Sequence, residues 1–373
     1  MKVTLSAKEL NNALSLFKDV ISKKAAIPSL LNIKLLFTSE KLIIIGTDLE
    51  NTLEVNIPVH NTDDEMEVLV DYEHLSKIIK IYEDEPIELL FENNIITIEG
   101  NTSVFDITYE DDLSTYPDTK IYNEHGRIDI DPSLLLNEIS KCMPLVSDDE
   151  LRPVMNCVHV YSDGNECVIE ATNSYILRQI KTIGVVHGQI DALFSKKASK
   201  VLTKLNSEYT IPIDTLSQII MYETKMQVNT EKYILTTTNY NDKYPNIASM
   251  LRDVEDDYKM KLNLGQLKKS VTKLSSLSYS ESNLIIFKIS DITVDIEIQD
   301  FDNSISGHIA LDPINLGNKL FEIGMNSKKL NDLLSVIDGE FIDFYIKDNS
   351  EAIILTVDDN KNDLSLIMPL KLN

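Results

Sequence analysis

A unit of about 125 to 130 residues recurs three times along the 373-residue chain, and this repeat limits the fold more than any other feature. Each copy has the same order: a strand, an amphipathic helix, strands around a Thr-Asp-like turn, a second amphipathic helix and further strands. Thr47-Asp48 and Thr172-Asn173, for example, lie 125 positions apart. The repeat predicts three similar α+β domains, each with two helices packed on β-sheets.

The limits of the copies follow from helix starts and polar stretches. The first helix of each copy is expected to begin after Ser6, Asp131 or Asn263, each a residue type that caps helices, and the second helix is expected to start near Asp71, Ser195 or Asn326. Polar, turn-rich segments at 122–129 and 252–259 separate the copies. The predicted domains are therefore residues 1–125, 126–253 and 254–373.

Charge is distributed unevenly between the predicted elements. The chain has 60 acidic residues against 35 Lys and Arg, yet "SKKASKVLTKLN" at 195–206 bears four lysines and no acid. Lys196, Lys200 and Lys204 recur every fourth residue and share one helix face. Phosphates can be bound by such spaced point charges without any recognition of base sequence. If the helices of all domains face a common space, the pattern predicts a basic, duplex-sized channel inside an acidic shell. A solvated lysine-rich face is the alternative.

Composition narrows the class of protein. The longest apolar runs are too short to cross a bilayer, and no secretion signal is recognisable, so a cytoplasmic location is expected. The three cysteines have no CxxC spacing, which predicts buried thiols and no zinc site.

Two rival classes fit less well. An enzyme is disfavoured because the six histidines show no HExxH motif, and neither a GxSxG elbow nor a phosphate loop is present. An acidic scaffold or DNA mimic would carry carboxylates along its helices, whereas the acids here crowd loop segments such as "YEDDLSTYPD". A protein that encloses the duplex in a channel would be released when circular DNA is linearised, and neither rival class would be.

Five segments carry a resemblance to a known family: "IPSLLNIKLLFTSEKLIIIGTDLENTLEV" (27–55), "RPVMNCV" (152–158), "EATNSYILR" (170–178), "KYPNIASML" (243–251) and "LIMPLKLN" (366–373). In this order and spacing the chain resembles the bacterial sliding clamp, the beta subunit of DNA polymerase III, over its whole length. The resemblance implies three clamp-fold domains per chain and a head-to-tail homodimeric ring, with the helices lining the hole. It implies a non-catalytic processivity factor that encircles duplex DNA, independently of base sequence and without a cofactor or metal.

The resemblance also implies three sets of site residues. Lys24 and Arg152 match positions near DNA, and the helix lysines complete a predicted DNA-binding set: Lys24, Lys80, Arg152, Lys196, Lys197, Lys200, Lys204, Lys268, Lys269 and Lys273. A groove between the second and third domains is expected to take short peptides, with a leucine and an aromatic residue, from polymerase, clamp loader and repair proteins. Its residues are Met155, Thr172, Ser174, Tyr175, Ile176, Leu177, Pro245, Met250, Leu366, Met368, Pro369, Leu370, Lys371 and Leu372. The alternative for "LIMPL" is a last core strand.

The third set is the dimer seam, where Phe105 and Ile107 are expected to meet Ser276 and Leu277 of the other subunit. Packing of these residues within their own domains is the alternative. Ser276 stands where a larger apolar residue is common, which predicts a ring that opens more readily.

The groove departs from the family pattern. Many clamps have Thr-Asp-Gly-His-Arg-Leu where this chain has Thr172-Asn173-Ser174-Tyr175-Ile176-Leu177. The change predicts a shifted partner preference and a diverged or second-copy clamp. The sequence does not identify the partners, nor does it distinguish a main replicative clamp from an accessory one.

Overall fold

The computed structural model describes residues 1–22, 25, 27–60, 65–119, 121, 123–163, 166–208, 217–240, 242–277, 282–290, 292–300, 304–314 and 320–372. They form two compact units. The first comprises Met1–Asn137 and Gly184–Asn241, and the second comprises Glu138–Ile183 and Asp242–Asn373. Because this division cuts through residues 126–253, it does not follow the repeat, and the three-domain organisation stays a prediction.

The helices begin where the repeat predicts. They are α1 (Ala7–Leu16), α2 (Tyr72–Ile79), α3 (Pro132–Cys142), α4 (Lys196–Glu208), α5 (Leu264–Ser276) and α6 (Ser327–Ser335). At every start the side chain of the residue before the helix accepts a hydrogen bond from the backbone N–H three residues later, which confirms the caps predicted at Ser6, Asp131 and Asn263. These bonds satisfy N–H groups that have no partner inside the helix, which is why each helix starts at that residue. No helix in the described part of the chain has the length and apolar character to cross a membrane.

The first unit contains two antiparallel sheets. The smaller one has the order β1 (Lys2–Ser6), β6 (Pro86–Glu92), β7 (Ile95–Glu99), β8 (Val104–Thr108). The larger one has the order β13 (Val185–Gly188), β9 (Gly126–Ile130), β15 (Ser217–Met221), β16 (Lys225–Asn229), β17 (Tyr233–Thr238), β4 (Asn51–Pro58), β3 (Lys41–Thr47), β2 (Asn32–Phe37), β5 (Met66–Asp71). A further strand, β14 (Asp191–Ser195), leads directly into α4.

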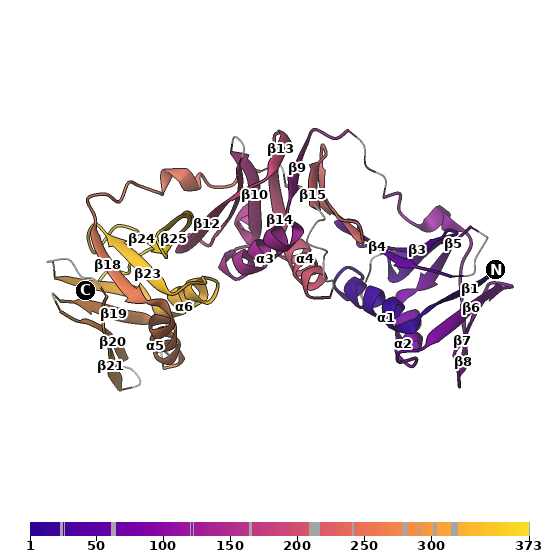
Figure 1. Cartoon of the computed structure of the whole chain (residues 1–373), viewed down its shortest axis with the longest axis horizontal. Helices are drawn as coiled ribbons and strands as arrows, with labels where there is room; N and C mark the ends of the chain where they lie inside the picture. Colours follow the sequence, from indigo (N-terminus) through magenta and orange to yellow (C-terminus); the bar gives the residue numbers. More distant parts are fainter. Residues whose placement is uncertain are drawn as a thin grey trace. The chain divides into compact units, whose positions relative to one another are not determined.

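The second unit repeats this plan. One run of strands has the order β10 (Cys157–Asp163), β11 (Glu166–Thr172), β12 (Ile176–Ile183), β25 (Asn360–Ile367), β24 (Ile353–Val357), β23 (Phe341–Ile346), β18 (Tyr258–Asn263). The other sheet has the order β21 (Ile305–Leu311), β20 (Val294–Asp300), β19 (Leu284–Ile289), β22 (Phe321–Asn326). Helices α5 and α6 pack together here, as α1 and α2 do in the first unit (Figure 1).

Each unit contains one junction between strands from different copies of the repeat. We call the antiparallel pairing of β4 with β17 the first seam, and that of β12 with β25 the second seam. Leu53 lies opposite Leu235 in the first seam, and Arg178 lies opposite Ser365 in the second. The helix α1 packs on β4 and on α4 beside the first seam. Each sheet thus continues from one predicted domain into the next.

Candidate binding groove and lysine-bearing helices

The groove predicted at the second seam begins with a hydrogen-bonded turn between β11 and β12. The Thr172 hydroxyl donates to the Ile176 carbonyl at 2.8 Å and accepts from the Ser174 N–H at 3.2 Å. Asn173 Oδ1 accepts from the N–H groups of Tyr175 and Ile176, each at 3.1 Å. Ser174 has a φ of 75°, in the left-handed region that glycine adopts most readily. The turn therefore keeps the backbone that a glycine would favour, with serine in its place.

The groove residues divide into an exposed rim and a buried base. Tyr175, Met250 and Met368 form the rim, with 56%, 50% and 37% of their surface exposed. Leu177 and Leu366 are buried and pack with Ile247, which the sequence did not predict. The Met368 N–H donates to the Tyr175 carbonyl at 2.8 Å, so the C-terminal segment continues beside the turn after β25 ends. Apolar rims with a rigid base are typical of peptide anchor sites.

The remaining predicted groove residues surround this cluster with varied exposure. Met155, Thr172 and Ile176 are buried, Pro245, Pro369, Leu370 and Leu372 are half-buried, and Ser174 and Lys371 are exposed. The Leu370 N–H donates to the Gly324 carbonyl at 2.8 Å, which ties the C-terminal segment to β22. Ile176 stands where the family pattern has a polar residue. Because Ile176 is fully buried, this difference lies at the base of the groove and not at its rim.

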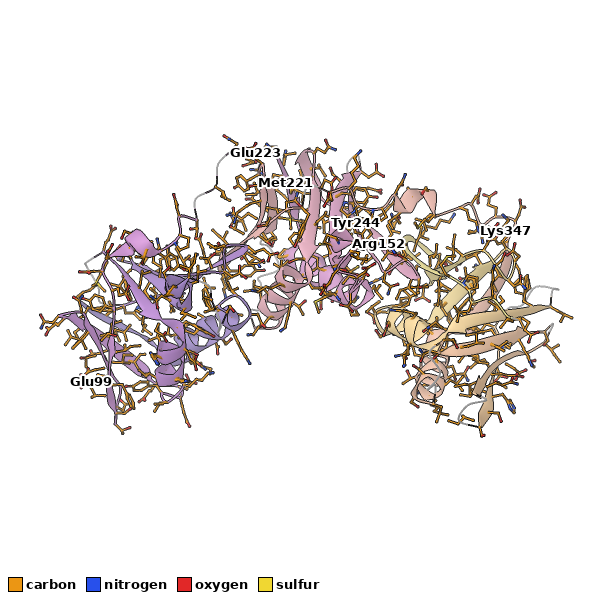
Figure 2. The ribbon with its side chains drawn as sticks, turned by 180° about the vertical axis from the view of Figure 1, so that it is seen from behind. Glu99, Arg152, Met221, Glu223, Tyr244 and Lys347 are labelled. Carbon is orange, nitrogen blue, oxygen red and sulfur yellow. The ribbon has the colours of Figure 1, made fainter. Side chains whose placement is uncertain are left out.

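An aromatic stack positions the segment that carries Pro245. The Tyr244 ring (Figure 2) lies 4.5 Å from the His159 ring, which stacks on Tyr161 at 4.7 Å between centroids. His159 Nδ1 lies 2.8 Å from Glu170 Oε1, and Gln179 Nε2 donates to the other Glu170 oxygen at 2.8 Å. Burial raises the pKa of the Tyr244 hydroxyl. A buried polar network of this kind holds one backbone path for the segment.

Arg152, predicted for the DNA-binding set, lies among groove residues (Figure 2). Its Nη1 donates to Ser174 Oγ at 3.4 Å and to Met155 Sδ at 3.9 Å, and its Nε lies 3.3 Å from Asp149 Oδ2. The side chain remains 61% exposed. It therefore places an exposed positive charge beside the predicted groove residues, and a contact with DNA stays a prediction.

The lysines of α4 mostly contact another copy of the repeat. Lys200 donates to Asp19 Oδ1 at 2.7 Å, and Lys204 Nζ lies 3.6 Å from the other oxygen of the same carboxylate. Although burial opposes its ionisation, these two ammonium groups hold the pKa of Asp19 below its usual range. Lys197 is bound to Asp48 and donates to the Val20 carbonyl at 3.5 Å. Part of the basic face at 195–206 thus contacts the preceding copy of the repeat beside the first seam, a role that its spacing did not reveal.

The other predicted basic residues differ in exposure. Lys268 donates to the Ile337 carbonyl and is half-buried, whereas Lys80, Lys269 and Lys273 are exposed. Lys196 is half-buried at the first position of α4. Lys24 lies outside the described residues. Among the described residues of the predicted DNA-binding set, Lys80, Lys269 and Lys273 are thus exposed, as is Lys200, whose ammonium group is paired with Asp19.

The predicted dimer residues lie at edges of their units. Strand β8 is the last strand of its sheet, and Val104, Phe105 and Ile107 are respectively exposed, half-buried and buried on it. The Phe105 ring contacts Tyr82 edge-on, with 6.0 Å between centroids. Leu277, after α5, is 44% exposed, and the Ser276 hydroxyl donates to the Lys273 carbonyl at 2.7 Å. Phe105 and Ile107 thus pack within their own unit, and their contact with a second subunit stays a prediction.

Comparisons with known proteins agree with this geometry. Residues 1–117 match the family model described as DNA polymerase III beta subunit, N-terminal domain. Among curated relatives, the beta sliding clamp of Bacillus subtilis is 20% identical and that of Pseudomonas aeruginosa 23% identical, each aligned over 100% of both chains.

Solved structures give the same result for the fold. A Pseudomonas aeruginosa sliding clamp (DNA polymerase III subunit beta) bound to griselimycin has a TM-score of 0.92 at 20% identity, with 100% of both chains covered. A Bacillus subtilis DNA polymerase sliding clamp has a TM-score of 0.90 at 19% identity, again over 100% of both chains. The predicted clamp fold is therefore confirmed. Residues 1–117 thus match the DNA polymerase III beta subunit family, and the whole chain is similar in sequence and in fold to sliding clamps.

Proposed function

We propose that this protein is a DNA sliding clamp, a processivity factor that encircles duplex DNA and tethers polymerase, clamp loader and repair proteins. The agreement with solved sliding clamps over the full length of both chains carries the proposal. A ring around DNA needs no tight phosphate contacts, because it cannot leave sideways. Its role is topological and non-catalytic, in the cytoplasm and without a cofactor.

The test of this function uses DNA topology. The protein, loaded onto a nicked circular duplex by a clamp loader, is expected to remain bound through gel filtration and to dissociate when one restriction cut linearises the DNA. Blocking both ends of the linear DNA with bulky protein is the matched control and should restore retention. Equal retention on open and blocked linear DNA would contradict a sliding ring.

The ring requires a third seam between two subunits, and the internal repeat specifies its strands. In both seams within the chain, the last strand of one copy pairs with the second strand of a hairpin in the preceding copy. These last strands are β17 and β25, and their partners are β4 and β12. The counterparts left over are β8 and β21, each the terminal strand of its sheet. We infer that β8 of one subunit pairs antiparallel with β21 of the other.

The correspondence between the copies also predicts the register in which β8 and β21 pair. Phe105 occupies the position of Leu235 in the first seam, and Ser306 occupies that of Leu53, which lies opposite Leu235. Phe105 and Ser306 of two subunits are therefore expected to lie directly opposite each other, with Cβ atoms about 5 Å apart.

A disulfide trap tests this register. The variant F105C/S306C is expected to form covalent dimers under mild oxidation, whereas F105C/A310C is the control, because Ala310 is exposed on the same face of β21 further along it. The native thiols give little background, since burial raises the pKa values of Cys142 and Cys167 to about 12. Equal cross-linking in both variants would exclude the register.

We assign phosphate contacts chiefly to the exposed lysines. Lys269 and Lys273 lie on α5 without the inter-copy ion pairs that occupy Lys197 and Lys200. The variant K269A/K273A is expected to weaken DNA binding and to reduce the slope of log affinity against log salt by about 1.8 if both lysines contact phosphates. The variant K347A, which removes an exposed lysine paired with Glu351, is the control. An unchanged slope would remove α5 from the DNA-binding surface.

The groove is proposed to bind the short peptides of these partners. The Pseudomonas aeruginosa relative is bound to griselimycin, which indicates a ligand site on that clamp. The altered turn at Ser174-Tyr175-Ile176 supports a shifted preference and the hypothesis of a diverged or second-copy clamp. Titration with the consensus peptide of standard clamps tests this hypothesis. Affinity equal to that of a standard clamp would refute the shift.

A further inference from the structure

A cavity beside the first seam repeats part of the groove at the second seam. It has a volume of about 280 Å³, and its walls include Ile27, Leu30, Thr47, Asp48, Leu49 and Lys197. Ile27, Leu30, Thr47 and Leu49 lie 125 positions before Arg152, Met155, Thr172 and Ser174, respectively. Four wall residues therefore correspond to four residues that lie together at the groove.

The two turns have the same backbone and the same hydrogen bonds. Leu49 has a φ of 78°, as Ser174 has 75°. The Leu49 N–H donates to Thr47 Oγ1 at 3.1 Å, the Thr47 hydroxyl donates to the Asn51 carbonyl at 3.1 Å, and Asp48 Oδ1 accepts from two later N–H groups. Leu30 lies on the short helix η2 (Pro28–Leu31), and Met155 lies on the matching helix η5 (Pro153–Asn156). Both seams thus build the same half-site from the same local structure.

The differences determine what the cavity can hold. Ile27 replaces Arg152, so an apolar side chain that is 43% exposed stands where the groove has a guanidinium. Leu49, 48% exposed, replaces the hydroxyl of Ser174. The one ammonium group among the wall residues, that of Lys197, is bound to the one carboxylate, that of Asp48. The cavity is therefore electrically balanced and more apolar than its counterpart, which fits a neutral, apolar occupant.

The volume of the cavity limits the occupant to one side chain. Where the groove has Met368 and Leu370, the first seam has Thr238 and Tyr240. The hydroxyls of Thr238 and Tyr240 donate to the carbonyl and the carboxylate of Glu50, at 3.3 and 3.1 Å, so both hydroxyls are already bonded within the first seam. An apolar cavity of about 150 Å³ already holds benzene, so about 280 Å³ admits one leucine or phenylalanine side chain.

We propose that this cavity is a second peptide site, which binds the leucine or aromatic side chain of the same class of short peptide that the groove takes. The proposal rests on the proposed function of the groove. Because only one anchor is buried here, the affinity is expected to be about tenfold or more below that of the groove.

The experiment uses a synthetic hexapeptide that contains one leucine followed by one 4-fluorophenylalanine, titrated into the full-length protein and followed by ¹⁹F NMR. Two bound signals that saturate at different peptide concentrations are expected. Leu49→Asn, which removes an apolar wall but suits a positive φ, should abolish the weaker signal alone. Met368→Glu, at the groove rim, should abolish the stronger signal alone.

The outcomes separate this proposal from the proposed groove. A single signal that disappears in Met368→Glu and is unchanged in Leu49→Asn would overturn the second site and leave the groove intact. No signal in any protein would reject the groove and the second site together. If Leu49→Asn removed both signals while its circular dichroism matched that of the parent, the two sites would not be independent and the proposal as stated would fail.

Discussion

The two seams share one backbone design but differ in how their cores are filled. The Thr238 N–H donates to the Glu50 carbonyl in the first seam at 3.0 Å, and the Met368 N–H donates to the Tyr175 carbonyl in the second at 2.8 Å. At positions that match between the copies of the repeat, the first seam has three apolar or aromatic residues, all fully buried: Ala13, Leu53 and Tyr233. The second seam has three charged residues there instead: Glu138, Arg178 and Asp363.

The charged core of the second seam is well paired. Arg178 is 2% exposed and donates from Nε and Nη2 to the two oxygens of Asp363, at 3.0 and 2.8 Å. Its Nη1 lies 3.1 Å from Glu138 Oε2. Although burial opposes its charge, Asp363 and the other acidic groups around it raise the pKa of Arg178 above its usual range. Such a network contributes little net stability compared with apolar packing, but the loss of one member leaves charges uncompensated.

The same strand pairing is thus compatible with an apolar core and with a charged core. We expect the charged core to make the seam selective, because only the correct register brings the three complementary groups together. We expect the apolar core to make the first seam more tolerant of sequence change. The seam that carries the predicted peptide groove is the selective one.

The largest expected effect comes from breaking the network at its centre. Arg178→Met should destabilise the second unit by about 3–5 kcal/mol, because Glu138 and Asp363 lose their counter-charge. Urea unfolding followed by far-ultraviolet circular dichroism measures it. Leu53→Met, the volume-conserving change at the matching position of the first seam, should cost less than about 1.5 kcal/mol. Similar losses from both changes would show that the charge is not what distinguishes the seams.

Transplanting the apolar core into the second seam should have the opposite effect. The triple variant E138A/R178L/D363Y is expected to be neutral or more stable by about 1–4 kcal/mol, because no buried charge is left without a partner. The variant E138A/R178L, which leaves Asp363 unpaired, is the control and should be destabilised in the same urea experiment. A triple variant as unstable as Arg178→Met would mean that packing around these positions differs between the seams.

Acid should weaken the ion pairs beside the two seams unequally. Lys200 and Lys204 hold the pKa of Asp19 low beside the first seam, as Lys141 does for Asp338 beside the second. A lowered folded pKa contributes stability above the unfolded value of about 3.9, and that stability is lost as the pH falls through the folded pKa. Asp19 is 18% exposed and Asp338 74% exposed, so the effect should be larger at Asp19.

The matched variants D19N and D338N measure this difference. D19N should lose about 1–2 kcal/mol at pH 7 and show a flatter dependence of stability on pH below about 5. D338N should lose less than about 1 kcal/mol. Unfolding curves recorded at several pH values between about 3 and 7 give both quantities. An equal response of the two variants would argue that exposure does not govern these pairs.

The sequence predicted what depends on local chemistry. All six helix starts were correct, since a capping side chain acts on an N–H only three residues away. The matching turns at Thr47 and Thr172 were located for the same reason. The partners of Lys197, Lys200 and Arg178 could not be predicted, because they lie in another copy of the repeat. Periodicity shows which face of a helix is polar but not which carboxylate comes to it. Arg152 was assigned by resemblance alone, and only its contacts associate it with the groove.

The smallest expected effect tests the turn that the two seams share. Ser174 and Leu49 both have a left-handed backbone, which costs an L-residue about 1–2 kcal/mol, while glycine loses about 0.5–1 kcal/mol of chain entropy. Ser174→Gly should therefore stabilise the second unit by about 0.5–1 kcal/mol in the urea experiment. Leu49→Gly should gain less in the first unit, because it also removes an apolar wall of the cavity. If Leu49→Gly stabilised its unit more than Ser174→Gly did, the Leu49 side chain would add nothing to packing at the first seam.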